Sequence, residues 1–195
     1  IVLTAWDIDM SGSITAGSQE MSVHGAKVDQ TIGLGATVKD LSLSDAEVGR
    51  VTATGGLTVG SSLSSHVTVD GLTDSSTDVL GRIRLDVINA DRRVEFANGA
   101  SSFNKGITVQ AAGGVTLLES VTTKQSEVLL YAGTATLTVA ATRSLSTSSQ
   151  LLTVTADDID FQEQSSISTG MASINFHTHS HHQISKPTNN SCFFA

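Results

Sequence analysis

Three histidines near the end of the chain have the spacing of a metal site. His177, His179 and His181 alternate along the segment FHTHSHH, and an extended strand projects alternate side chains from the same side. Imidazole nitrogen is a preferred ligand of zinc, copper and nickel. The pattern therefore predicts a shared transition-metal site. The alternative is a diverged end of the sequence with no ligand.

Two pairs of aspartates have a similar spacing and suit a harder cation. Asp7 and Asp9 alternate near the start of the chain, and Asp158 and Asp160 alternate near its end. Each pair could share one Ca²⁺, but calcium takes six to eight oxygens, so turn carbonyls and water would have to complete the site. The G-G-x-G-x-D run of calcium-binding β-rolls is missing. The simpler interpretation of both pairs is an outward-facing acidic edge.

Residues that could cleave a polysaccharide are present but scattered. Such a reaction requires clustered carboxylates, often with a basic residue nearby. The charged residues that could serve are Asp74, Asp78, Asp86, Asp91, Arg92 and Arg93. Their spacing does not bring them to one face, and the sequence has neither a G-x-S-x-G elbow nor a phosphate loop ending in G-K-[ST]. We therefore expect a protein that is not an enzyme and has no cofactor.

Several positions are candidates for attached sugars. Asn189 stands in the acceptor sequence N-N-S, which is glycosylated only in an exported protein. Serine and threonine are dense at 61–65 (SSLSS) and 144–149 (SLSTSS), where outward-facing hydroxyls could carry O-linked sugars. The alternative is a bare hydroxyl surface.

Charge and composition exclude several partners. The net charge is −8, so a nucleic-acid backbone, which requires a basic patch, is not expected. The basic segments 81–86 (GRIRLD) and 91–93 (DRR) have acidic neighbours and are interpreted as solvated surface. The single cysteine, Cys192, excludes an internal disulfide. No run reaches the roughly 18 apolar residues that a membrane-spanning helix requires.

The elements that must position these groups are short strands. Apolar residues alternate with serine and threonine, and this period of two places one set inward and the other outward. Glycine, serine, asparagine and aspartate separate the runs. Strands are expected at 55–62, 66–71, 83–88, 93–98, 106–111, 114–120, 127–133, 135–141 and 151–159. One helical turn is expected at 43–50.

A long internal repeat organises these strands. IVLTAWDID at the start of the chain aligns with LTVTADDID at 152–160, and the alignment continues so that Gly17 faces Gly170 and His24 faces His177. The sequence therefore divides into one full repeat (1–151), the start of a second (152–183) and an irregular tail (184–195). Because the chain begins inside a repeat, we expect it to be a piece or a processed product of a longer protein.

Stacked coils account for such a repeat better than a sandwich does. Coils share one continuous core and add about 4.8 Å each along the axis. At about 20–25 residues per coil, the 151-residue block would hold six or seven coils, roughly 30 Å of rod. A β-sandwich is the alternative fold. An ice-binding solenoid is disfavoured, because its Thr-x-Thr triplets (52–54, 134–136 and 153–155) do not recur at a constant coil length.

Motifs such as LTVTADDID, ITAGS, GLTVGS and GITVQAAGGVTL resemble those of filamentous-haemagglutinin-like adhesins and related tandem-repeat β-solenoid surface proteins. The resemblance covers most of residues 1–176. It implies a right-handed parallel β-helix, export to the cell surface or extracellular space, and a role in adhesion or in an extracellular fibre. It transfers no catalytic residue. The alternating histidines resemble the metal-binding tips of trimeric phage tail spikes, although the rest of the chain lacks that family's features.

The sequence thus predicts a non-enzymatic structural repeat protein that forms a rod or fibre by end-to-end stacking with its own copies. We expect glycans on its surface and adhesion as a second role. The first alternative is a carbohydrate-binding or polysaccharide-cleaving β-helix, although few aromatic residues are present to stack on sugar rings. The second alternative is a phage-type spike with a histidine-bound metal.

Overall fold

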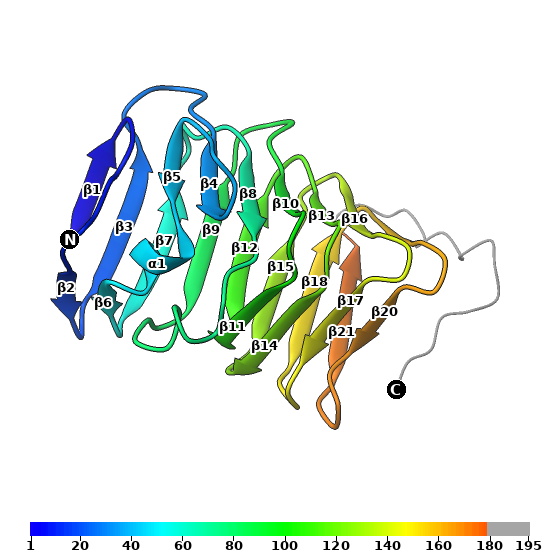
Figure 1. Cartoon of the computed structure of the whole chain (residues 1–195). Helices are drawn as coiled ribbons and strands as arrows, with labels where there is room; N and C mark the ends of the chain where they lie inside the picture. The colour runs from blue at the N-terminus through cyan, green and yellow to red at the C-terminus, as the bar shows by residue number, and fades with distance from the viewer. Residues whose placement is uncertain (179–195) are drawn as a thin grey trace.

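Strands pair with the next turn of the chain rather than with their neighbours in sequence. The computed structural model describes residues 1–178, and the strand pairs in this range are parallel. One strand from each turn joins an eight-stranded sheet in chain order, and the turns stack along one axis (Figure 1). The predicted parallel β-solenoid is confirmed. A sandwich, which is built from antiparallel sheets, is excluded. The right-handedness of the coil stays a prediction.

Three sheets form the faces of the solenoid. The first sheet contains β1 (Val2–Ala5), β3 (Glu20–Gly25), β7 (Gly56–Gly60), β9 (Ile83–Val87), β12 (Ile107–Ala111), β15 (Val128–Tyr131), β18 (Leu152–Ala156) and β21 (Ile174–Thr178). The second contains β5 (Leu41–Leu43), β4 (Ile32–Gly35), β8 (Val67–Asp70), β10 (Val94–Phe96), β13 (Val115–Leu117), β16 (Thr136–Val139) and β19 (Asp158–Phe161). The third contains β11 (Ser101–Lys105), β14 (Val121–Gln125), β17 (Ser144–Thr147) and β20 (Ser166–Ser168), and β2 (Ile14–Gly17) pairs separately with β6 (Val51–Ala53).

The nine strands expected from the sequence all contain observed strands, and α1 (Asp45–Val48) lies inside the expected helical turn. The third sheet was not predicted. Its strands are short and carry serine or threonine at most outward positions and at some inward ones. This composition weakens the alternation on which the prediction depends.

The turns differ in length, although their strands stay in register. Ile83 pairs with Ile107, 24 residues later, whereas Met21 pairs with Leu57, 36 residues later. The expected length of about 20–25 residues is therefore too short for the second turn. The extra residues form β5 and α1. β5 pairs with β4 as the last strand of the second sheet, so the register of the other strands is undisturbed (Figure 1).

The inserted β5–α1 segment is held against the first turn by side chains. The Ser42 N–H donates to Asp7 Oδ1 at 2.9 Å, and the Met10 N–H donates to Glu47 Oε1 at 2.8 Å. Ser44 and Glu47 form a capping box at the start of α1, which satisfies backbone N–H groups that a helix start leaves unpaired. The insertion thus replaces strand pairing in this corner of the first turn.

Inward side chains from successive turns stack into apolar columns. One column of the first sheet contains Leu3, Val23, Val59, Leu85, Val109, Leu130, Val154 and Phe176. Six of these eight are almost fully buried, and those of the first and last turns are partly buried. Each buried Val or Leu contributes about 1.5–3 kcal/mol. Phe96 and Phe103 pack edge to face inside the core, with ring centroids 6.4 Å apart.

A column of buried threonines lies where the third sheet ends. Thr123 pairs with Thr147 in neighbouring strands, and both side chains are almost fully buried. Thr147 Oγ1 donates to the Gln150 carbonyl at 2.6 Å, and Thr169 makes the same bond to Ala172 at 2.6 Å. The Thr123 hydroxyl is buried without a hydrogen-bond partner among the described residues. Two stacked threonines therefore differ in one hydrogen bond.

This difference predicts opposite effects of the same substitution. Thr147→Val should lower the free energy of unfolding by about 1 kcal/mol, because the Gln150 carbonyl loses its donor. Thr123→Val should leave stability unchanged or raise it, because it removes an unsatisfied buried hydroxyl at nearly constant volume. Urea denaturation of the two variants and the parent chain measures both values. Equal losses in the two variants would contradict the assigned hydrogen bonds.

Candidate functional site

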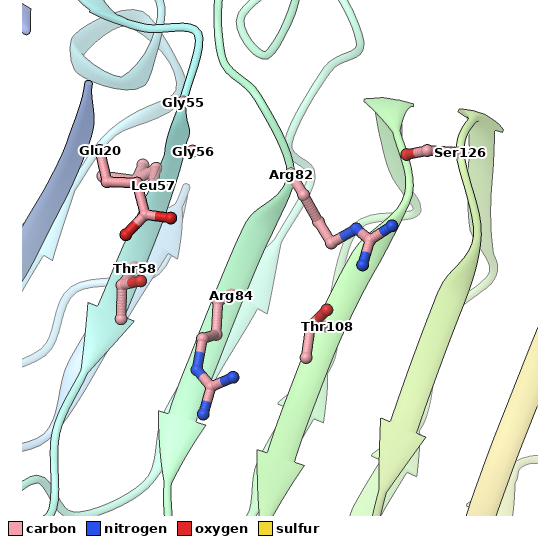
Figure 2. A pocket seen from close by; sticks show the side chains of 9 residues that line it. All are labelled: Glu20, Gly55, Gly56, Leu57, Thr58, Arg82, Arg84, Thr108 and Ser126. Atoms are coloured by element: carbon pink, nitrogen blue, oxygen red, sulfur yellow. The ribbon is translucent and has the colours of Figure 1, made fainter. Parts of the chain in front are cut away.

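A groove of about 640 Å³ lies on the outer face of the first sheet, over β3, β7, β9 and β12. Among the residues that line it are Glu20, Gly56, Thr58, Arg82, Arg84 and Thr108 (Figure 2). Their side chains come from four successive turns, and we call this feature the groove.

One row of residues across the strands alternates charged side chains with glycine. The row is Glu20 (β3), Gly56 (β7), Arg82 (just before β9), Gly106 (just before β12) and Glu127 (just before β15). Arg82 NH2 lies 3.1 Å from Glu127 Oε1, so the arginine extends across Gly106 to a residue two strands away. Because strands are about 4.8 Å apart, Glu20 and Arg82 have backbones about 10 Å apart across Gly56.

The two glycines are required by the backbone. Gly56 has a φ of 136°, which side-chain-bearing residues rarely adopt. A Cβ at Gly106 would lie 2.0 Å from the Glu127 carbonyl oxygen. Because the Arg82 side chain crosses Gly106, the open space in the row lies over Gly56, which lines the groove (Figure 2).

A second row runs along the axis two residues further into the strands. It consists of Thr58, Arg84 and Thr108, which are register partners in successive strands. Arg84 NH2 donates to Gln110 Oε1, and Arg84 Nε lies 3.5 Å from Asp86 Oδ2. These contacts direct the guanidinium along the strand, toward the register partners Asp86 and Gln110 and away from the two threonines (Figure 2).

The groove and its border carry more acid than base. Glu20, Asp86 and Glu127 contribute three carboxylates against the two guanidinium groups. Among residues 1–178 no hydrogen bond or ion pair of the Glu20 carboxylate is found, and Asp86 Oδ1 is buried without a hydrogen-bond partner. The groove therefore offers guanidinium donors, hydroxyls and unpaired carboxylate oxygens, without a net positive charge.

The acids of the groove are too far apart for glycoside cleavage. Paired catalytic carboxyl groups stand about 5–10 Å apart. Glu20 and Glu127 lie four strand spacings apart, about 19 Å between backbones. Asp86 lies two strands and four residues from either glutamate, about 16 Å. The arrangement suits binding of a polar chain.

The charged residues that the sequence suggested for cleavage do not come together. Only Asp86 borders the groove. The contacts of the others are Asp74 with Lys124, Asp78 with Asn104, Arg92 with Asp29, and Arg93 with Glu95. These pairs lie in corners, in the third sheet and on the second sheet. The candidate residues are therefore as scattered in space as their spacing in the sequence suggested. Asp91 lies in a turn with a φ of 62°.

The two aspartate pairs differ in their surroundings. Asp158 and Asp160 lie in β19, with the buried Ile159 between them, so both point outward as expected. Asp7 and Asp9 lie outside any strand, and Asp7 accepts the bond from Ser42. No group of three or more His, Cys, Asp or Glu side chains arranged for a metal occurs within residues 1–178. Calcium at either pair stays a prediction.

Of the three alternating histidines only His177 belongs to the described residues. It lies at the outer face of β21 and pairs with Thr155 in register, whereas His179 and His181 lie outside the described residues. His24, its counterpart in the repeat, lies in β3, and its Nε2 is 3.1 Å from Thr4 Oγ1.

The glycosylation candidates are only partly accessible. Asn189 lies outside the described residues. In the two serine-rich segments, Ser64, Ser65 and Thr147 are buried, so they cannot carry sugar in the folded chain. Ser148 and Ser149 are exposed.

Sequence reasoning missed the groove itself. The segment GRIRLD was interpreted as solvated surface, but its alternation places Arg82 and Arg84 on one outer face. The sequence held one signal, because Gly56 and Gly106 stand at the starts of strands in the same register as Arg82. This register could be assigned only once the lengths of the turns were known.

Comparisons with family models, curated proteins and solved structures find no match to this chain. The resemblance to filamentous-haemagglutinin-like proteins therefore stays a prediction beyond the β-solenoid fold. Within the described residues, no helix has the length and apolar character needed to cross a bilayer.

His66 is held in an environment that disfavours its charged form. It precedes β8, and its Nδ1 accepts the Arg93 N–H at 3.1 Å. Burial, followed by the charges of Arg93 and Arg92, lowers the pKa of His66 below its usual 6.5. The unfolded chain therefore binds a proton at His66 before the folded chain does.

Stability should consequently fall as the pH falls through the unfolded pKa of about 6.5. His66→Gln, which keeps an acceptor for the Arg93 N–H, should reduce the loss of unfolding free energy between about pH 7.5 and pH 5.5. Chemical denaturation at both pH values measures this loss. An equal loss in the variant and the parent chain would show that His66 does not titrate differently on folding.

Proposed function

We propose that this chain is part of a non-enzymatic structural rod, in which a 151-residue block of coils is followed in register by the next block. The observation that carries the proposal is the position of the repeat in the first sheet. Residues that align in sequence occupy the same columns at the two ends of the described chain.

Four aligned pairs show this correspondence. Leu3 and Val154 share an inward column, and Thr4 and Thr155 share the adjacent outward one. His24 stacks on Thr4 as His177 stacks on Thr155. Gly17 and Gly170 also match, with φ of 59° and 60° at the end of β2 and β20. In the first sheet, β18 and β21 thus take the places of β1 and β3.

The correspondence determines which strand of a further block would pair with the last strand of this one. Since β21 has the place of β3, the edge of β21 that faces away from β18 presents the backbone that β3 presents to β7. A strand with the sequence of β7 fits this edge, and a bare edge favours association with other strands. From β1 to β18 the first sheet advances six strands, about 29 Å of axis per block.

The location and the surface roles are part of the same proposal. A rod built of serine, threonine and small aliphatic residues, with few aromatics, suits the cell surface or the extracellular space. It is also the kind of chain that the adhesin-like motifs resemble. Exposed hydroxyls such as those of Ser148 and Ser149 would carry the glycans. End-to-end association of separate chains uses the same strand edges as continuation within one chain.

A fusion protein tests the register of the repeat. Residues 1–151 placed directly before the full 195-residue chain should give one continuous rod, longer than the parent by about 29 Å. Small-angle X-ray scattering measures the maximum dimension, and a single cooperative unfolding transition is expected.

The matched control joins the blocks out of register. Residues 1–162 before the full chain place β1 where a strand of the third sheet belongs, so a flexible joint between two rods is expected. If the two fusions give the same scattering profile, or if the in-register fusion behaves as two beads, the repeat does not continue the solenoid and the proposal fails.

A further inference from the structure

We propose that the groove binds a neutral, extended polysaccharide, with the sugar chain parallel to the solenoid axis. This inference goes beyond the structural role and does not depend on it. It rests on the spacing of the polar groups in the groove, on how they are held, and on the balance of charge around them.

The spacing of the groove matches a polymer with a short repeat. Thr58, Arg84 and Thr108 are register partners, so their backbones follow one another at one-strand intervals of about 4.8 Å along the axis. A β-linked chain of pyranose rings advances by nearly this distance per ring. Successive sugars would therefore meet the outward side chains of successive strands.

The flanking row supplies the stronger hydrogen bonds. The carboxylate of Glu20 accepts from sugar hydroxyls beside the hollow at Gly56, and the guanidinium of Arg82, which is directed toward Glu127, donates to them with its remaining N–H groups. Arg82 is held by Glu127, and Arg84 is held by Gln110 and Asp86. Side chains that are already fixed lose little freedom on binding.

Charge and shape disfavour other polymers. Three carboxylates against two guanidinium groups repel nucleic acids and polyuronates. A peptide would need an open strand edge or an apolar pocket, whereas the groove lies on the face of the sheet. Leu57, the one aliphatic side chain of its lining, is buried. A hydroxyl-rich neutral chain satisfies donors and acceptors of both signs.

Titration of the full chain with cellohexaose, a neutral β-linked hexasaccharide, tests the proposal by calorimetry. Glu20→Gln should weaken binding about tenfold, as expected for one charge-assisted hydrogen bond. Thr58→Lys should abolish binding, because the longer side chain fills the groove. Glu95→Gln is the control, since it changes an outward carboxylate on the second sheet and should leave the affinity unchanged.

Circular dichroism of each variant establishes that the fold is intact, and both groove positions are outward-facing. The site is wrong if Thr58→Lys binds cellohexaose as the parent chain does. The ligand class is wrong if cellohexaose and laminarihexaose both fail to bind, including the case in which polygalacturonate or chitosan oligomers bind instead. A failure of this kind leaves the in-register fusion result unaffected, so the two proposals are tested separately.

Discussion

Parallel pairing in constant register is the constraint on which the rest of the molecule depends. Every strand of the three sheets takes its hydrogen bonds from the turns before and after it, so a side chain's neighbours along the axis are fixed by register. An inward column must therefore stay apolar and similar in size over eight turns, as the column from Leu3 to Phe176 does. The end strand of a sheet is free of this constraint on one side, which is why the second turn can hold the β5–α1 insertion, with β5 at the end of the second sheet.

The same constraint creates the groove. In the row from Glu20 to Glu127 the backbone conformation at Gly56 and the close approach at Gly106 exclude side chains. The charged residues between them consequently stand apart at twice the strand spacing. Regular spacing along the axis is a property of the fold, and the chemistry of a face depends on which side chains occupy the outward columns. A structural rod and a binding face are compatible in one solenoid for this reason.

The sequence predicted the parts of the fold that depend on alternation and self-similarity. The strands of the first two sheets from β7 to β18, the turn at α1 and the solenoid class follow from period-two patterns and the long repeat, whereas β1, β3, β4, β5 and β21 were not among the expected strands. The third sheet did not, because hydroxyl side chains such as Thr123 and Thr147 also face inward there. The groove was not predictable, because unequal turn lengths hide that Gly56, Arg82 and Gly106 are neighbours.

The distance between Ser22 in β3 and Thr153 in β18 tests the register most directly. Both face outward in one column of the first sheet, five strand spacings apart. Spin labels at these two positions, with Cys192 changed to serine, should give a single narrow distance distribution near 24 Å, apart from the length of the labels. A broad distribution, or a distance below about 15 Å, would contradict the stacked solenoid.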